Sequence, residues 1–256
     1  MEDSLKRHLK YQICTIIAAL GACTGAFAGA AQAAGIGTIL DVVNDGYRTP
    51  PGAEERDARP ADEVVQDEML RTADKSAISV KFVDGSELSV EALSEVVLSD
   101  YVYDGQASAG LINLNDGLFH FTSNGKNDQG VKLRTPIATI GIRGTGFDWS
   151  DRRNTGLAVM SGIVRLCDAK SGKCVNLSEN CEVGQAGGSQ AQEFSGAQAG
   201  ELIVGNLPYV LDQRPLNRQF HLPTSKCKQA VAKFLNSGSG SNSLRNPPPQ
   251  RCSECG

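Results

Sequence analysis

The sequence predicts a mainly β fold, built from short antiparallel strands and hairpins in a compact sandwich or a stacked, solenoid-like domain. Apolar β-branched and aromatic residues alternate with polar ones over short stretches from Ile78 onward. Turn-forming pairs such as Asp-Gly and Ser-Gly separate these stretches at fairly regular spacing. A clear helical period occurs only near the C-terminus. Many short strands with regular turn signals are typical of such β architectures.

The first 33 residues have the composition of a secretory signal peptide, which we exclude from the fold. A basic start precedes an apolar run over 13–28 and a small-residue cleavage site at Ala31-Gln32-Ala33. We therefore expect a periplasmic or secreted protein with no transmembrane segment after cleavage. Two alternatives are a retained membrane anchor and a lipoprotein acylated at Cys23, because Leu20-Gly21-Ala22-Cys23 resembles a lipobox.

The charge of the chain argues against a nucleic-acid partner. Its formal net charge is −4, and removal of the signal peptide leaves it acidic. Proteins that bind nucleic acid usually present a basic surface. An acidic cluster between Thr49 and Asp67 has no EF-hand spacing, so we interpret it as a solvated surface loop. We predict no metal and no cofactor.

A series of hairpins is expected from Ile36 to Leu133. Residues 36–43 form a plausible first strand. A three-residue loop after Val83 pairs Phe82 with Leu88, since their parity favours an odd loop. Asp116-Gly117 is a strong two-residue turn signal, which predicts a second hairpin with Leu114 opposite Phe119. His120 then points to the opposite face, with no ligand partner nearby in sequence.

The stretch from Arg134 to Trp149 is predicted to be a structural pivot. Its β-branched residues suit a buried strand, and Gly141, Gly144 and Gly146 indicate a bulge or tight bend. Arg143 is the one cation inside the apolar and glycine-rich part of this stretch, and its guanidinium can donate to carbonyls that the bend leaves unpaired.

A three-stranded meander should follow the pivot. Turns at Ser161-Gly162 and Lys170-Ser171 place the apolar residues of all three strands on one face. The second turn puts Cys167 directly opposite Cys174, within disulfide reach. An exported protein can form this bond, and we predict it.

Several motifs together resemble the FecR domain family over roughly Gly35 to Phe194. The resemblance rests on the Glu68–Thr72 and Phe82–Ser86 segments, on Ser161-Gly162-Ile163-Val164, and above all on one signature. The signature residues are Thr135, Pro136, Gly141, Arg143, Gly144, Thr145 and Phe147.

The resemblance implies an extracytoplasmic β module that senses or binds and is not an enzyme. Its partner would be an envelope protein, either a membrane transducer or an outer-membrane receptor. Full regulators of the family usually carry a cytoplasmic anti-sigma segment and a membrane helix ahead of this domain. We expect a stand-alone, secreted FecR-like protein, for which direct control of a sigma factor is doubtful.

The C-terminal part divides into an extension and a tail. We expect a FecR-like β domain over 34–195, an extension with one helix over 196–236, and a flexible tail over 237–256. Residues 186–200 are a connector, and Leu202–Leu211 is a candidate strand. Ser225–Asn236 has an apolar helical stripe, which Thr224 can cap.

Six cysteines follow the signal peptide, at 167, 174, 181, 227, 252 and 255. They allow fifteen pairings, and sequence alone does not choose among them. With Cys167–Cys174 assigned, Cys181–Cys227 would fasten the helix to the β domain and leave Cys252 with Cys255. A zinc site from His221 and Cys227, Cys252 and Cys255 is an alternative that an oxidising compartment disfavours. A redox role for the terminal Cys-x-x-Cys lacks a βαβ context.

Two other functions remain open from sequence. The Gly144-Thr145 bond lies in a bend, where attack of the hydroxyl on the Gly144 carbonyl would make a self-processing module. A simple tight turn is the alternative. Asp148 and Asp151 are also near neighbours, as carboxylates that cap a turn often are. A structural or glycan-associated envelope protein is the third class of function.

Overall fold

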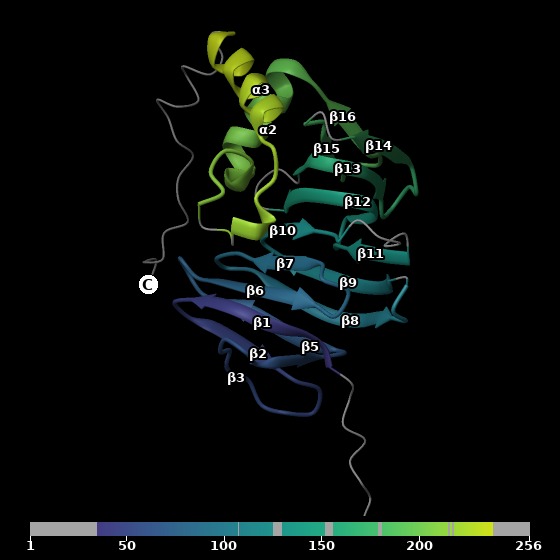
Figure 1. The fold of residues 1–256 in the computed structure, drawn as a ribbon. Helices are drawn as coiled ribbons and strands as arrows, with labels where there is room; N and C mark the ends of the chain where they lie inside the picture. The colour runs from purple at the N-terminus through teal and green to yellow at the C-terminus, as the bar shows by residue number, and fades with distance from the viewer. Residues whose placement is uncertain are drawn as a thin grey trace, which may run out of the picture. The chain divides into compact units, whose positions relative to one another are not determined.

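The computed structural model describes residues 35–106, 108–124, 130–151, 156–178, 181–214, 216 and 218–237. The predicted signal peptide, Cys23, Cys252 and Cys255 lie outside these ranges. Within them the chain forms one curled β-sheet with helical segments against one side (Figure 1). No helix among the described residues is long and apolar enough to cross a membrane.

The sheet begins with strands β1 Gly35–Val43, β2 Gly46–Thr49, β3 Arg56–Asp57, β4 Glu63–Val65, β5 Glu68–Thr72, β6 Ala77–Phe82, β7 Glu87–Val90 and β8 Glu95–Tyr103. It continues with β9 Ser108–Asp116, β10 Leu118–Thr122, β11 Gly130–Arg134, β12 Ala138–Ser150, β13 Gly156–Asp168, β14 Cys174–Ser178, β15 Val183–Gln185 and β16 Gln192–Phe194. The helical segments are α2 Gly196–Asn206, η1 Pro208–Val210, η2 Arg218–Phe220 and α3 Ser225–Asn236. The predicted mainly β fold is confirmed.

Strand β12 changes partner halfway along its length. It pairs with β11 through residues 139–141 and with β10 through residues 146–150, while β13 follows it on the other side. We call the outer face of β11, the first half of β12 and the second half of β13 the open wall. The covered wall is the outer face of β7, β10, the second half of β12 and the first half of β13.

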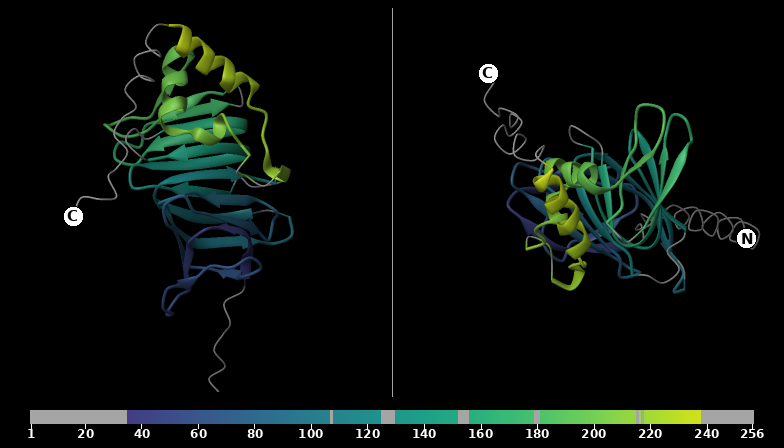
Figure 2. Two further views of the ribbon diagram at one scale, coloured as in Figure 1. Left: turned by 90° about the vertical axis from the view of Figure 1, so that its left-hand side faces the viewer. Right: turned by 90° about the horizontal axis from the view of Figure 1, so that it is seen from above.

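Apolar residues form two clusters, one inside the curled sheet and one outside it. The inner cluster contains the inward-facing residues of nearly every strand, among them Phe119, Phe147 and Trp149. The second cluster joins Ala158 and Met160 of β13 to α2, η1 and α3. Figure 2 shows these helical segments lying along one side of the strands. Burying apolar surface on both faces stabilises the covered wall more than the open wall.

The first predicted hairpin has the correct parity but the wrong register. Val80 lies opposite Leu88, not opposite Val90, and the loop is Val83-Asp84-Gly85. Three-residue loops place a left-handed residue last, and Gly85 has a φ of +87°. The glycine therefore fixes the loop one position earlier than predicted.

Two other predicted hairpins are wrong. Strands β9 and β10 do not pair, because β9 lies between β8 and β11 while β10 lies between β7 and β12. The chain crosses at Gly117, whose φ is +122° and whose N–H donates to the Asp151 carboxylate at 2.7 Å. Ser161-Gly162 is a bulge inside the continuous strand β13.

The predicted strand Leu202–Leu211 is also wrong, since α2 and η1 occupy this region and the extension contains two helices. Ala199, Gly200 and Ile203 form the buried stripe of α2. A Cβ on Gly200 would lie 2.5 Å from the Ala230 carbonyl oxygen, so glycine permits close packing against α3. Helix α3 has the predicted bounds, although the side chain of Thr224 makes no capping hydrogen bond.

Candidate functional site

The centre of the signature is a bulge shared by β12 and β13. Gly144 and Gly162 both have left-handed backbones, with φ of +59° and +71°. A Cβ on Gly162 would lie 2.0 Å from the Gly144 carbonyl oxygen, so only glycine fits there. The two strands bend together here and pass from the open wall to the covered wall.

The Thr145 hydroxyl provides the hydrogen bonds that this bulge needs. It accepts the Arg143 N–H at 2.8 Å and donates to the Ile163 carbonyl at 2.9 Å. The Thr145 N–H donates to the Ser123 hydroxyl at 2.8 Å. Arg143 was expected to satisfy the bend through its guanidinium, but its side chain is exposed and its backbone takes part instead.

Three further signature residues have structural roles, in a turn between two strands or in the core. The Thr135 hydroxyl accepts the Ala138 N–H at 2.9 Å and, together with Pro136, forms the tight turn between β11 and β12. Phe147 packs in the inner cluster, with its ring centroid 5.7 Å from that of Phe121. Gly141 and Arg143 of the signature lie on the outer face, in the open wall.

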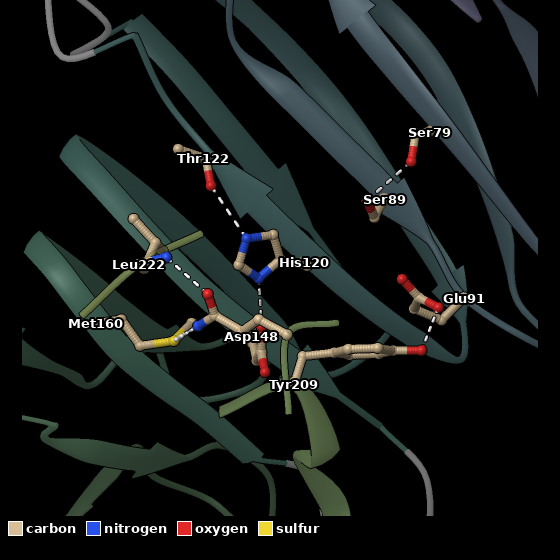
Figure 3. Close-up of polar contacts among 10 residues, drawn as sticks. Ser79, Ser89, Glu91, His120, Thr122, Asp148, Met160, Tyr209 and Leu222 are labelled. Carbon is tan, nitrogen blue, oxygen red and sulfur yellow. Dashed lines mark hydrogen bonds and ion pairs between the residues drawn. The ribbon is translucent and has the colours of Figure 1, made fainter. Parts of the chain in front are cut away.

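A row of polar side chains crosses the covered wall. His120 and Asp148 lie directly opposite each other, and their Nδ1 and Oδ1 atoms are 2.6 Å apart. Both side chains are almost completely buried. Nε2 of His120 lies 3.1 Å from the Thr122 hydroxyl, and Ser89 lies opposite His120 on β7 (Figure 3).

The described residues between Leu207 and Leu222, which we call the strap, lie over this row. Tyr209 donates its hydroxyl hydrogen to the Glu91 carboxylate. Gln213 accepts the Leu222 N–H at 2.7 Å and contacts the Met160 sulfur at 3.5 Å (Figure 3). The strap is tied to the sheet beyond Leu222 by the Cys181–Cys227 disulfide.

Leu222 occupies space that a side chain at position 146 would need. A Cβ on Gly146 would lie 2.2 Å from Cδ1 of Leu222 and 2.9 Å from the Ser161 hydroxyl. Gly146, the third glycine of the predicted pivot, thus lets the strap approach the sheet. Its role is different from that of Gly144, which serves the bulge.

Glu87 is the least compensated acid of the covered wall. Its side chain is 1% exposed, and neither carboxylate oxygen has a hydrogen-bond partner in the described structure. Burial raises the pKa of Glu87 to about 8, although Lys81 on the neighbouring strand lowers it. Near neutral pH this carboxyl is therefore mostly protonated in the folded chain.

A pocket of about 330 Å³ opens beside the polar row. Its polar lining includes Ser79 and Ser89, whose hydroxyl oxygens are 3.2 Å apart, and the Glu91 carboxylate. Leu216 of the strap also lines it. The covered wall thus combines buried ionisable groups with a small cavity at the edge of the strap.

Residues 68–165 match the family model described as FecR protein. The resemblance to FecR is confirmed over this segment. It contains both halves of the signature bend and all of the polar row except the strap residues that cover it. No curated protein matches the sequence.

Several solved structures align weakly with the chain. Two crystal structures of a proposed anti-sigma factor from Parabacteroides distasonis ATCC 8503 align at 16% identity and a TM-score of 0.40. Each alignment covers 49% of this chain and 58% of the other, so the chain spans little more than half of that protein's length. A cell surface anchoring domain aligns at 21% identity and a TM-score of 0.25, over 26% of this chain and 87% of that one.

Sequence reasoning missed two buried networks in the FecR segment. Glu68 at its start is fully buried and pairs with Arg48, whose Nε lies 2.5 Å from Oε1. The Asp84 carboxylate accepts the hydroxyls of Tyr101 and Ser108 at 2.7 and 2.5 Å. A carboxylate at an inward position of an alternating strand was the available signal for Glu68. Nothing near Asp84 in the sequence identifies Tyr101 as its partner.

The cysteines and the remaining candidate ligands occupy structural roles. Cys167 is bonded to Cys174 and Cys181 to Cys227. The alternative zinc site is therefore wrong, since Cys227 is not a free thiolate. No group of three or more His, Cys, Asp or Glu among the described residues is arranged to hold a metal ion. Asp148 and Asp151 do not act as a pair, because the first contacts His120 and the second accepts the Gly117 N–H.

Proposed function

We propose that this chain is an exported sensing or binding module that acts in envelope signalling through protein–protein contacts and is not a catalyst. The FecR match over residues 68–165 carries this proposal. Two disulfides are compatible with an oxidising, extracytoplasmic compartment. The partner is an envelope protein, either a membrane transducer or an outer-membrane receptor.

The domain organisation belongs to the same proposal. A signal peptide over 1–33 is removed, the FecR-like domain occupies 34–195, and the extension over 196–236 covers one wall of it. The tail predicted over 237–256 lies, from residue 238 onward, outside the described residues. Lipidation at Cys23 is the alternative mode of localisation.

Affinity capture from periplasmic and membrane fractions tests the proposal. The bait is the full chain, exported and disulfide-bonded, with a reduced sample as the matched control. Recovery of a specific transducer or receptor by the oxidised bait supports a signalling role. Sedimentation of the protein with the cell wall, without any protein partner, would instead identify a structural or glycan-associated envelope protein.

The intact mass of the exported protein separates binding from self-processing. A single chain that begins at Ala34 supports a binding module. Two fragments that meet at Gly144-Thr145 would support self-processing, provided that Thr145→Ala abolishes the break and Thr145→Ser preserves it. For that reaction the Thr145 hydroxyl must first leave its hydrogen bonds to Arg143 and Ile163.

A further inference from the structure

Four basic side chains lie close together on the open wall. Lys132 and Arg165 lie on either side of Gly141 in one row across β11, β12 and β13. Arg134 lies two residues from Lys132 along β11, and Arg143 lies two residues from Gly141 along β12. All four cations are exposed.

The strand register fixes the size of this basic patch. Neighbouring strands are about 4.8 Å apart, and residues two apart on one strand are separated by about 7 Å. The Cα atoms of the four cations therefore fall within roughly 10 by 14 Å, and long basic side chains span such distances easily. One extended polyanion can contact all four.

Among the described residues, these cations lack the ion-pair partners that two exposed arginines elsewhere in the chain have. Arg71 pairs with Glu55 at 2.6 Å, and Arg214 pairs with Asp212 at 2.5 Å. None of the four patch cations forms an ion pair with a described residue. Like charges held this close repel one another, so binding of an anion lowers the electrostatic free energy of the patch.

Gly141 leaves a gap at the centre of the patch. Its φ is not in the left-handed range, so its backbone conformation does not require glycine. A Cβ there would approach nothing more closely than Arg165, at 3.9 Å. The missing side chain keeps the sheet backbone accessible between Lys132 and Arg165.

An exposed aliphatic side chain adjoins the basic groups. Ile163 is 47% exposed and lies directly opposite Arg143. Carboxylates interleaved with aliphatic side chains match this surface, whereas an anionic polysaccharide has no aliphatic side chain to cover Ile163. The mixed character of the patch therefore favours a protein segment over a glycan.

We propose that the open wall docks an acidic segment of the partner protein, with carboxylates between Lys132 and Arg165 over Gly141 and an aliphatic side chain on Ile163. This inference rests on the proposed function, because it names the surface and the chemistry of the partner. Electrostatic complementarity would set both the orientation and the association rate of this contact.

The first test measures the binding of a fluorescent peptide that alternates Glu and Leu, with a Gln-Leu peptide as the uncharged control. The acidic peptide should bind the full chain, and binding should weaken as NaCl rises from about 20 to about 300 mM. Lys132→Gln with Arg165→Gln should raise Kd about tenfold or more. The matched control is Arg59→Gln with Lys233→Gln, which removes two exposed charges elsewhere and should change Kd less than twofold.

A second variant separates shape from charge. Gly141→Leu fills the gap without removing a cation, and it should raise Kd for the acidic peptide severalfold while the urea midpoint stays unchanged. Equal binding by the patch and control variants overturns the proposal, as does tighter binding of polygalacturonate than of the peptide. If affinity capture recovers a partner equally with the patch variant, the signalling role survives and this docking surface does not.

Discussion

The two halves of the β12–β13 ladder have the same alternation but opposite surroundings. On the open wall, Arg143 and Arg165 project from it into solvent without described ion-pair partners. On the covered wall, Asp148 is buried against His120 under the strap. The bulge at Gly144 and Gly162 separates the halves. An outward-facing residue is therefore not always an exposed one. Where the strap buries an ionisable side chain, that side chain needs a hydrogen-bond or ion-pair partner within the fold.

Removing a charge from the covered wall should have the largest effect. Asp148→Ala leaves Nδ1 of the buried His120 without its partner, and breaking a buried pair costs about 3–5 kcal/mol of unfolding free energy. Urea denaturation at neutral pH measures the loss. On the open wall, Arg165→Ala should change stability by less than about 0.5 kcal/mol. Equal losses in the two variants would refute the distinction between the halves.

The two disulfides should differ in the same direction. Cys181–Cys227 joins residues 46 apart and holds the strap region on the covered wall, whereas Cys167–Cys174 joins residues only 7 apart on the open wall. Loop-closure entropy assigns about 4 kcal/mol to the longer loop and about 2.5 kcal/mol to the shorter.

Two double variants, each with both cysteines of one disulfide replaced by serine, test this order when their thermal denaturation is compared. The double variant Cys181→Ser with Cys227→Ser should have the lower Tm. A larger loss on removing Cys167–Cys174 would show that the strap adds little to the stability of the sheet.

Glu87 should make stability depend on pH. Its pKa rises from an ordinary value of 4.5 to about 8 on folding, so the folded chain binds this proton more tightly than the unfolded chain. The resulting stability is complete below the unfolded pKa and is lost as pH rises toward and through 8. Between about pH 5 and pH 8 the loss is on the order of 3 kcal/mol.

Glu87→Gln should therefore flatten the pH profile and make the chain more stable than the wild type at pH 8. Urea midpoints measured at about pH 5, 6.5 and 8 define the slope of stability against pH. Lys81→Gln is a useful companion, because removing the cation that lowers this pKa should steepen the profile. A Glu87→Gln profile as steep as that of the wild type would exclude Glu87 as its source.

A pair of glycine substitutions gives the smallest and most closely matched contrast. Gly146→Ala on the covered wall displaces Leu222 or Ser161 and should cost about 1–2 kcal/mol. Gly141→Ala on the open wall has room and should be neutral or stabilising by up to about 1 kcal/mol, because alanine restricts the unfolded chain. Equal effects would show that the strap does not constrain position 146.

Much of the sheet could be predicted from local pattern, and two of the errors have a common cause. The opposition of Cys167 and Cys174 follows from one turn and strict parity, and both survive in the structure. Asp116-Gly117 is an equally strong turn signal, yet its two strands join different neighbours. A turn pair fixes where the chain bends, while long-range pairing decides which strand it meets. The Leu202–Leu211 error has the same origin, since packing of Ala199 and Gly200 on α3 outweighs the β preference of its aliphatic residues.

The sequence by itself determined the β class, the inward alternation, the bend at Gly144 and the bounds of α3, because these depend on residues near one another in the chain. Only the tertiary structure decided that β12 changes neighbours at the bend, that His120 meets Asp148, and that Leu222 lies over Gly146. Those contacts join residues far apart in sequence, and the last two depend on burial under the strap. No local pattern of residues encodes that burial.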